Sequence, residues 1–252
     1  TATGATLALA DRLDSLVGIF SIGQQPSGSR DPFALRRASL GVLRIIIERD
    51  IDLDLTLAIS NAAAQFADLS SAKLSGDELC EQVLTYILER FKAWYREEGI
   101  GPEVFAAVSS LGLSNPLDIN ARVQAVQQFS QLPEAIALAA ANKRVSNILA
   151  KQLGDSAPAA IDVELLQEDA EKHLATEIER LTHAVRPLFE QRDYTGILSQ
   201  LAKLRQPVDS FFDDVMVMAE NIPLRNNRLA LLHSLRQLFI DVADISQLAP
   251  TK

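Results

Sequence analysis

The sequence predicts an all-α protein, on three observations. Apolar residues recur at three- and four-residue spacing through nearly every segment, which is the period of a helix with one buried face. The apolar–polar alternation of a strand is absent, and so are the Asn-Gly and Asp-Gly pairs of tight hairpins. The chain should therefore fold as a set of packed helices.

The first half of the chain predicts four helices and a shorter one that opens near Pro102. The fourth helix is the clearest, because Leu79, Val83 and Ile87 follow one another at four-residue spacing. The four ranges are 5–20, 32–49, 54–69 and 77–98. A boundary follows where Gly112, Asn115 and Pro116 lie close together, and it predicts two domains, 1–116 and 117–252.

The second half predicts a helical bundle. A loop over residues 154–162 interrupts it, and Pro187 predicts a bend or an end in the long helix that follows. The predicted helices are 117–130, 133–152, 163–190, 193–205, 207–219 and 223–241.

Composition and charge bound the class of protein. The chain has 252 residues, of which 48% are hydrophobic and 23% charged, as in soluble globular proteins. No apolar run approaches the roughly 20 residues that span a bilayer. The single cysteine, Cys80, excludes an internal disulfide and fits the reducing cytoplasm. The chain starts without Met and without a basic leader, so we expect a piece of a longer cytoplasmic protein.

The net charge of −9 argues against broad electrostatic binding to DNA or RNA. Residues 1–117 carry 10 Lys or Arg against 15 Asp or Glu, and residues 118–252 carry 14 against 18. Both halves are thus acidic, and any contact with nucleic acid requires a local basic patch.

The stretch SIGQQPSGSRDPFALRRASL, residues 21–40, joins a loop to a helix. Asp31 and Pro32 are typical of a helix start, and the glycine spacing matches neither of the common phosphate-binding loops. A capped helix is one interpretation. The other is that Arg36 and Arg37, one turn into the helix, contact an RNA phosphate.

Two later segments combine basic and amide side chains. In ANKRVSNILAKQ, the residues Lys143, Arg144, Asn147 and Lys151 lie at helical spacing and predict a polar, basic stripe. Such a stripe can contact phosphates and exposed bases, or it can be an ordinary solvated face.

PLRNNRLALLHSLRQLF repeats this mixture at a helix start. Arg225, Asn226 and Arg228 are the candidate RNA contacts there, next to Asn227. Arg228 has an alternative role, in which it pairs with Asp213 or Asp214 and holds the bundle together.

Catalytic groups are sparse. LADRLDSL places Asp11 and Asp14 on one helical face, which resembles the last element of an HD-type metal phosphohydrolase. The three histidines, His173, His183 and His233, all lie in the second half and lack metal-ligand spacing. No hydrolase triad is recognisable, and we expect no catalytic residue and no metal site in this chain.

Longer motifs then agree with one another. LADRLDSLVGIFSIGQQPSGSRDPFALRRASLGVLRIIIE resembles the beta subunit of the bacterial heterotetrameric glycyl-tRNA synthetase near the end of its HD-like domain. LPEAIALAAANKRVSNILAK and VDSFFDDVMVMAENIPLRNNRLALLHSLRQLFIDVADISQL resemble the C-terminal anticodon-binding domain of that subunit, of the all-helical DALR type. The sequence departs from the family at Ile222-Pro223, where an acidic residue is expected.

The resemblance implies a role. The chain would be the tRNA-binding part of a glycine–tRNA ligase, while a separate alpha subunit uses ATP and Mg²⁺ to charge tRNA-Gly with glycine. This chain itself would need no cofactor. Its partners would be tRNA-Gly and the alpha subunit, without membrane or DNA. Two alternatives stay open: an HD-type phosphohydrolase remnant, and a structural scaffold for subunit assembly.

Overall fold

The computed structural model describes residues 1–66, 72–154, 156 and 158–250. Within these ranges the chain forms helices and their connections without a named strand, and one isolated bridge joins Ser27 to Arg30. The predicted all-α class is confirmed. The chain divides into two compact units, and each is described by itself below.

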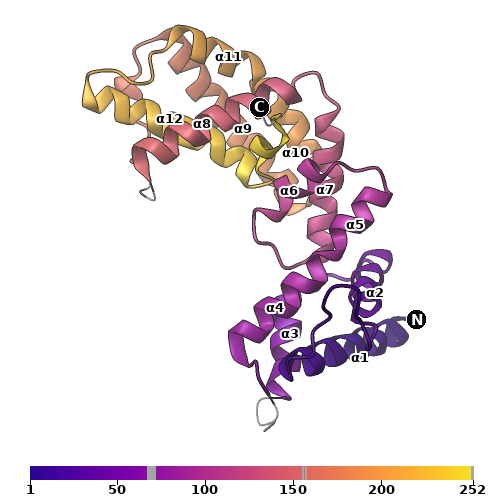
Figure 1. Ribbon diagram of the computed structural model, residues 1–252. Coiled ribbons are helices and arrows are strands. Elements are labelled where there is room, and N and C mark those ends of the chain that lie inside the picture. The colour runs from indigo at the N-terminus through magenta and orange to yellow at the C-terminus, as the bar shows by residue number, and fades with distance from the viewer. Residues whose placement is uncertain (67–71, 155, 157, 251–252) are drawn as a thin grey trace. The chain divides into compact units, whose positions relative to one another are not determined.

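The first unit comprises residues 1–102 and 112–120. Helix α1 packs against the next three helices of the chain and lines the core of this unit (Figure 1). Its buried side chains are spaced as one helical face: Leu9, Leu13, Leu16, Val17 and Phe20. The helices are α1 (Ala2–Ser21), α2 (Leu35–Glu48), α3 (Leu55–Ala64), α4 (Gly76–Leu88) and α5 (Arg90–Glu97).

The third and fourth predicted helices of this unit differ most from their predicted bounds. The segment 77–98 forms α4 and α5 because the chain tightens at Glu89, whose carbonyl accepts from the N–H of Lys92 three residues on (3.2 Å). Helix α3 ends at Ala64, and residues 67–69 of the predicted helix lie outside the described residues.

The second unit comprises residues 103–111 and 121–252. Helix α12 is its central element, because it packs against α8, α9 and α10 and buries side chains around most of its circumference (Figure 1). A helix that is apolar on most sides is expected in the middle of a bundle. The helices are α6 (Pro102–Ser109), α7 (Pro116–Ser130), α8 (Ala135–Leu153), α9 (Asp169–Glu190), α10 (Tyr194–Leu201), α11 (Arg205–Asp214) and α12 (Ile222–Ile240). The first residue of α6 and the first five of α7 belong to the first unit.

Three short 3₁₀ turns accompany these helices, at Val163–Leu165, Ala202–Leu204 and Ile245–Leu248. The first explains why the predicted helix 163–190 is divided. Glu171 accepts hydrogen bonds from the N–H groups of Gln167 and Glu168, so the helix is capped there and α9 begins at Asp169. Pro187 neither ends nor divides α9, which continues to Glu190.

Near the predicted domain boundary, two short segments of the chain alternate in the unit to which they belong. Residues 103–111 belong to the second unit, in which the N–H of Asp244 donates to the carbonyl of Ala107 (2.8 Å). Residues 112–120 belong to the first unit, in which the hydroxyl of Tyr95 donates to Oδ1 of Asn120 (3.1 Å). The predicted boundary after residue 116 falls at the first turn of α7.

No helix among the described residues combines the length and the apolar character needed to cross a bilayer.

Candidate nucleic-acid interface

One exposed face of α8 carries the first predicted stripe. Leu138, Asn142, Val145 and Leu149 face the core, which turns the intervening residues outward. Arg144, Asn147 and Lys151 are exposed and Lys143 is half-buried. The structure thus brings together all four side chains that the sequence predicts on this helix, and we call them the α8 stripe.

Charge is segregated around this stripe. Helices α8 and α12 pack side by side, run in opposite directions (Figure 1), and together carry six Lys or Arg and no Asp or Glu. The rest of residues 118–252 keeps eight basic residues against 18 acidic ones. This acidic chain, with a net charge of −9, therefore contains two packed helices that have no acidic residue of their own.

Two of these six cations are paired within the protein. Arg228 pairs with Glu171, and Nη2 of Arg236 lies 3.5 Å from Oδ2 of Asp244. The other four are Lys143, Arg144, Lys151 and Arg225, and none of them forms an ion pair within the described part of the chain. These four charges are available to an anionic partner.

An aromatic ring supports the stripe. The guanidinium carbon of Arg144 lies 4.1 Å from the ring centroid of Phe212 at the end of α11, which is a cation–π contact. Phe212 is half-buried, whereas the adjacent Phe211 is buried and meets it edge-on, with the centroids 5.6 Å apart. The Arg144 guanidinium therefore lies over a ring that packs against the buried Phe211.

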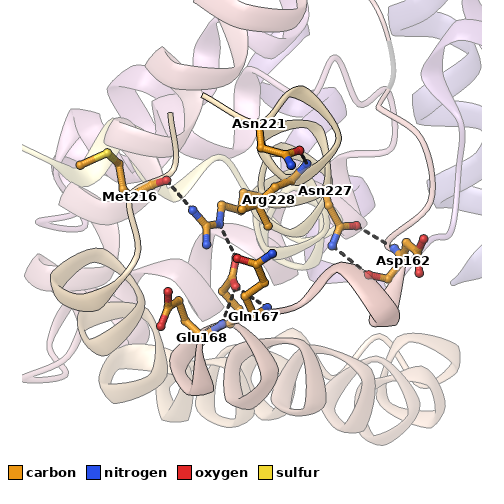
Figure 2. Close-up of polar contacts among 9 residues, drawn as sticks. Asp162, Gln167, Glu168, Met216, Asn221, Asn227 and Arg228 are labelled. Atoms are coloured by element: carbon orange, nitrogen blue, oxygen red, sulfur yellow. Dashed lines mark hydrogen bonds and ion pairs between the residues drawn. The ribbon is translucent and has the colours of Figure 1, made fainter. Parts of the chain in front are cut away.

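The residues of the second predicted cluster, at the start of α12, differ in burial. Asn226 is exposed and Arg225 is half-buried, so both reach the surface. Asn227 is buried. Its amide group makes two hydrogen bonds to the backbone of Asp162, accepting from the N–H (2.7 Å) and donating to the carbonyl (2.9 Å) (Figure 2).

Arg228 lies inside the bundle. It leaves only 4% of its surface exposed, Nε donates to the buried carboxylate of Glu171, and Nη1 donates to the carbonyl of Met216 (2.7 Å) (Figure 2). The structure gives Arg228 a structural role in place of the predicted RNA contact, because an enclosed guanidinium cannot meet a phosphate or a base. Its partner is Glu171, whereas the predicted partners Asp213 and Asp214 are exposed.

The surroundings of Glu171 keep its carboxylate charged. Burial raises its pKa, but the hydrogen bonds from Arg228 and from the N–H groups of Glu168 and Gln167 outweigh this effect and hold the pKa below the ordinary value. This hydrogen-bonded, buried ion pair ties the start of α9 to α12 and to the connection before α12.

In the opening loop of the first unit, charged side chains make hydrogen bonds within the protein. Helix α2 begins at Leu35, three residues after the predicted start at Pro32. The Asp31 carboxylate accepts from the N–H groups of Leu35 (2.8 Å) and Arg36 (3.0 Å). Asp31 thus caps the helix as predicted, and its negative charge occupies the place that a phosphate would take.

The two arginines of this loop differ. Arg36 is half-buried, and its guanidinium donates to the carbonyl of Gly28, so it holds the loop closed. Arg37 is exposed. Of the predicted contacts in the first unit, Arg37 is the side chain that remains turned to solvent.

The other candidate groups form no comparable arrangement. Asp11 and Asp14 are exposed on α1 and line a groove beside α3. In the described residues, no group of three or more His, Cys, Asp or Glu side chains is placed to hold a metal ion. Cys80 is half-buried, and its pKa is raised by burial and by the nearby carboxylate of Asp77.

Sequence reasoning missed Phe212 and the connection before α12. The segregation of charge could have been recognised from the sequence, because two segments lack Asp and Glu: AIALAAANKRVSNILAKQL and IPLRNNRLALLHSLRQLFI. That the two segments pack against each other required the structure.

The matches to known protein families follow the two halves of the chain. Residues 1–110 match the family described as "Glycyl-tRNA synthetase beta subunit", and residues 123–246 match the "DALR anticodon binding domain".

Three relatives are glycine–tRNA ligase beta subunits. That of Marinobacter nauticus is 56% identical over 251 residues, which is 100% of this chain and 35% of the relative. That of Chromohalobacter salexigens is 54% identical over 248 residues, 98% of this chain and 35% of the relative. That of Pseudomonas aeruginosa is 53% identical over 248 residues, 98% of this chain and 36% of the relative.

The chain thus spans about a third of the length of the curated relatives that it matches. The two matched families together account for most of its residues, in the order of its two halves. The chain therefore belongs to the family of glycyl-tRNA synthetase beta subunits, with a DALR anticodon binding domain over residues 123–246.

Proposed function

We propose that this chain is the tRNA-binding part of a glycine–tRNA ligase beta subunit and recognises the anticodon region of tRNA-Gly. The acid-free pair of helices α8 and α12 carries the proposal, because it presents Lys143, Arg144, Lys151 and Arg225 within the matched DALR domain. A local basic face on an acidic protein favours contact with a limited stretch of RNA over coverage of a whole helix.

The proposed contacts have separate tasks. Lys143 and Lys151 bear compact charges on flexible stems, which suits phosphates. Asn147 and Asn226 are exposed amides that can hydrogen-bond base edges, and Arg225 reaches the surface beside Asn226. Arg37 is a further candidate for a phosphate elsewhere on the tRNA or for a subunit interface.

The chemistry of glycylation is proposed for another chain. A separate alpha subunit would use ATP and Mg²⁺ to activate glycine and transfer it, in the cytoplasm, and the beta subunit would hold the tRNA in the heterotetramer. The residues of this chain would contribute binding energy and orientation to that reaction.

The experiment is tRNA binding by the full-length beta subunit that carries this chain, together with the alpha subunit. Binding of tRNA-Gly and of a tRNA-Gly with a substituted anticodon is compared at two salt concentrations. The proposal expects weaker binding of the substituted tRNA at both concentrations. Equal affinity for the two tRNAs would contradict anticodon recognition.

For residues 1–116 we propose a structural role in subunit assembly. Leu7 and Leu57 are 72% and 64% exposed, and the groove between α1 and α3, of about 720 Å³, has Leu7 in its lining. Large exposed apolar side chains beside an apolar groove are typical of surfaces that another protein element covers. Loss of association with the alpha subunit on Leu7→Asp/Leu57→Asp, with tRNA binding kept, would support this role.

A further inference from the structure

The connection between α11 and α12 exposes apolar side chains. In this segment, residues 215–221, which we call the methionine loop, Val215 and Val217 point inward with 6% and 7% exposed. Met216 and Met218 alternate with them and are 74% and 42% exposed. Ile222, which opens α12, is 58% exposed. Three large apolar side chains therefore face solvent within seven residues.

This exposure is fixed by the buried network. Met216 turns its carbonyl oxygen toward Nη1 of Arg228 and its thioether away from it (Figure 2). At the other end of the loop, Oδ1 of Asn221 accepts from the N–H of Leu224 (3.1 Å) and caps α12. The loop is therefore held at both ends by hydrogen bonds.

The start of the methionine loop adjoins the α8 stripe. Phe212 lies three residues before the loop, and its ring carries the Arg144 guanidinium at 4.1 Å. Arg144 is exposed, so a flat group can still reach its guanidinium from the solvent side. Unstacked bases stack on aromatic rings and on arginine planes in this manner.

The charge around the loop excludes phosphate as its ligand. Asp213 and Asp214 precede the loop, Glu220 lies within it, and all three carboxylates are exposed. Carboxylates repel the phosphate backbone, but they accept hydrogen bonds from the amino groups of bases, as in the contact of Asp or Glu with cytosine N4. Exposed thioethers and carboxylates together fit bases and do not fit the backbone.

We infer that the second unit binds the phosphates and the bases of an RNA loop on two different surfaces. Phosphates lie along Lys143 and Lys151 of the α8 stripe, and unstacked bases turn toward Arg144, Phe212 and the methionine loop, where Asp213 and Asp214 accept from exocyclic amino groups. Bases that carry such a group are preferred over uracil. The inference rests on the proposed function and names the part of the tRNA that each surface meets.

The experiment separates these surfaces by salt and by sequence. The full-length beta subunit with its alpha subunit is titrated with tRNA-Gly transcripts in which each anticodon nucleotide is changed in turn to uracil, over a series of salt concentrations. The variants are Asp213→Asn/Asp214→Asn, Phe212→Leu and Lys151→Ala. Asp209→Asn is the matched control, since it makes the same change at another exposed position of α11.

The expected results differ between the surfaces. Asp213→Asn/Asp214→Asn and Phe212→Leu should reduce discrimination between at least one pair of transcripts by about 5- to 100-fold. Both variants should leave the salt dependence of the tRNA affinity unchanged. Lys151→Ala should weaken binding of all transcripts evenly and lower the slope of log affinity against log salt by about 0.7. Asp209→Asn should do neither.

Three results would overturn the inference. If Asp213→Asn/Asp214→Asn strengthens binding of all transcripts equally, the carboxylates only repel RNA, although the proposed function stands. If Met216→Ala and Met218→Ala weaken association with the alpha subunit and leave tRNA binding unchanged, the loop is a protein-docking surface. If the unmodified protein does not discriminate between any transcripts, the proposed function itself fails. Circular dichroism of each variant checks that the fold is intact.

Discussion

The opening loop of the first unit and the α8 stripe of the second contain the same ingredients and use them in opposite ways. Each combines arginine with a helix and with small polar residues. In the loop, Asp31 occupies the start of α2 and Arg36 bonds to the carbonyl of Gly28, so the charges are used inside the protein. Helices α8 and α12 themselves contain no Asp or Glu, and Lys143 and Lys151 of α8 form no ion pair within the described residues. The difference shows that a basic motif remains for a partner only where contacts within the protein do not already engage its side chains.

The strongest disturbance of the second unit should come from its buried arginine. Arg228→Ala leaves the Glu171 carboxylate enclosed without its cation, which costs about 3–5 kcal/mol of unfolding free energy. Chemical denaturation followed by circular dichroism measures the loss. The matched control is Arg180→Ala, which breaks the exposed Arg180–Glu177 pair (2.8 Å) and should cost far less. Equal losses for the two variants would contradict the structural role of Arg228.

Acid should disturb the same pair. The pKa of Glu171 is lowered in the folded protein, so its charge stabilises the fold above the unfolded pKa of about 4.3, and this contribution is lost as the pH falls through the folded pKa. Unfolding free energy measured from pH 6 to pH 3 should therefore fall more steeply for the unmodified protein than for Glu171→Gln. Parallel curves would mean that Glu171 is not held charged by the fold.

Affinity for tRNA should separate the two regions directly. Lys143→Ala/Lys151→Ala should lower the affinity for tRNA-Gly about tenfold, because two phosphate contacts are lost. The same double change in the opening loop, Arg36→Ala/Arg37→Ala, should have a smaller effect, since Arg36 is already engaged by Gly28. Filter binding at fixed salt decides the order. A larger loss for the loop variant would reverse the comparison.

The smallest effect concerns the cap of α2. Asp31→Ala removes the acceptor for two N–H groups and should cost about 1 kcal/mol of unfolding free energy. Asp31→Asn keeps one of the two acceptor oxygens and should restore part of the loss. Denaturation midpoints of the two variants check this prediction, and a loss that Asn does not reduce would exclude capping as the cause.

The sequence predicts the helices well and their joints less well. The periodic segments became helices because apolar spacing dictates burial, as on α1, where Leu9 and Leu13 begin a continuous inner face. The start of α9 escaped prediction because it depends on Glu171, whose side chain both caps that helix and pairs with Arg228, 57 residues away along the chain. The capping bonds are local, but the pairing of Glu171 with Arg228 leaves no local signal.

The candidate site shows the same limit. The stripe of Lys143, Arg144, Asn147 and Lys151 follows from helical spacing alone and lies on one surface as expected. Asn227 and Arg228 belong to a similar local pattern of arginine and asparagine, but both side chains are buried. Burial of a polar side chain depends on which distant backbone or carboxylate it meets, as Asn227 meets Asp162.

The exposed methionine loop has a consequence for redox chemistry. Both methionines of the chain, Met216 and Met218, lie in that loop, and the described core contains neither. Oxidation turns a thioether into a polar sulfoxide, and reductases can reverse the reaction. An oxidant that acts on methionine would thus alter the surface of this domain without adding oxygen to its core, and the damage would be repairable in the folded state.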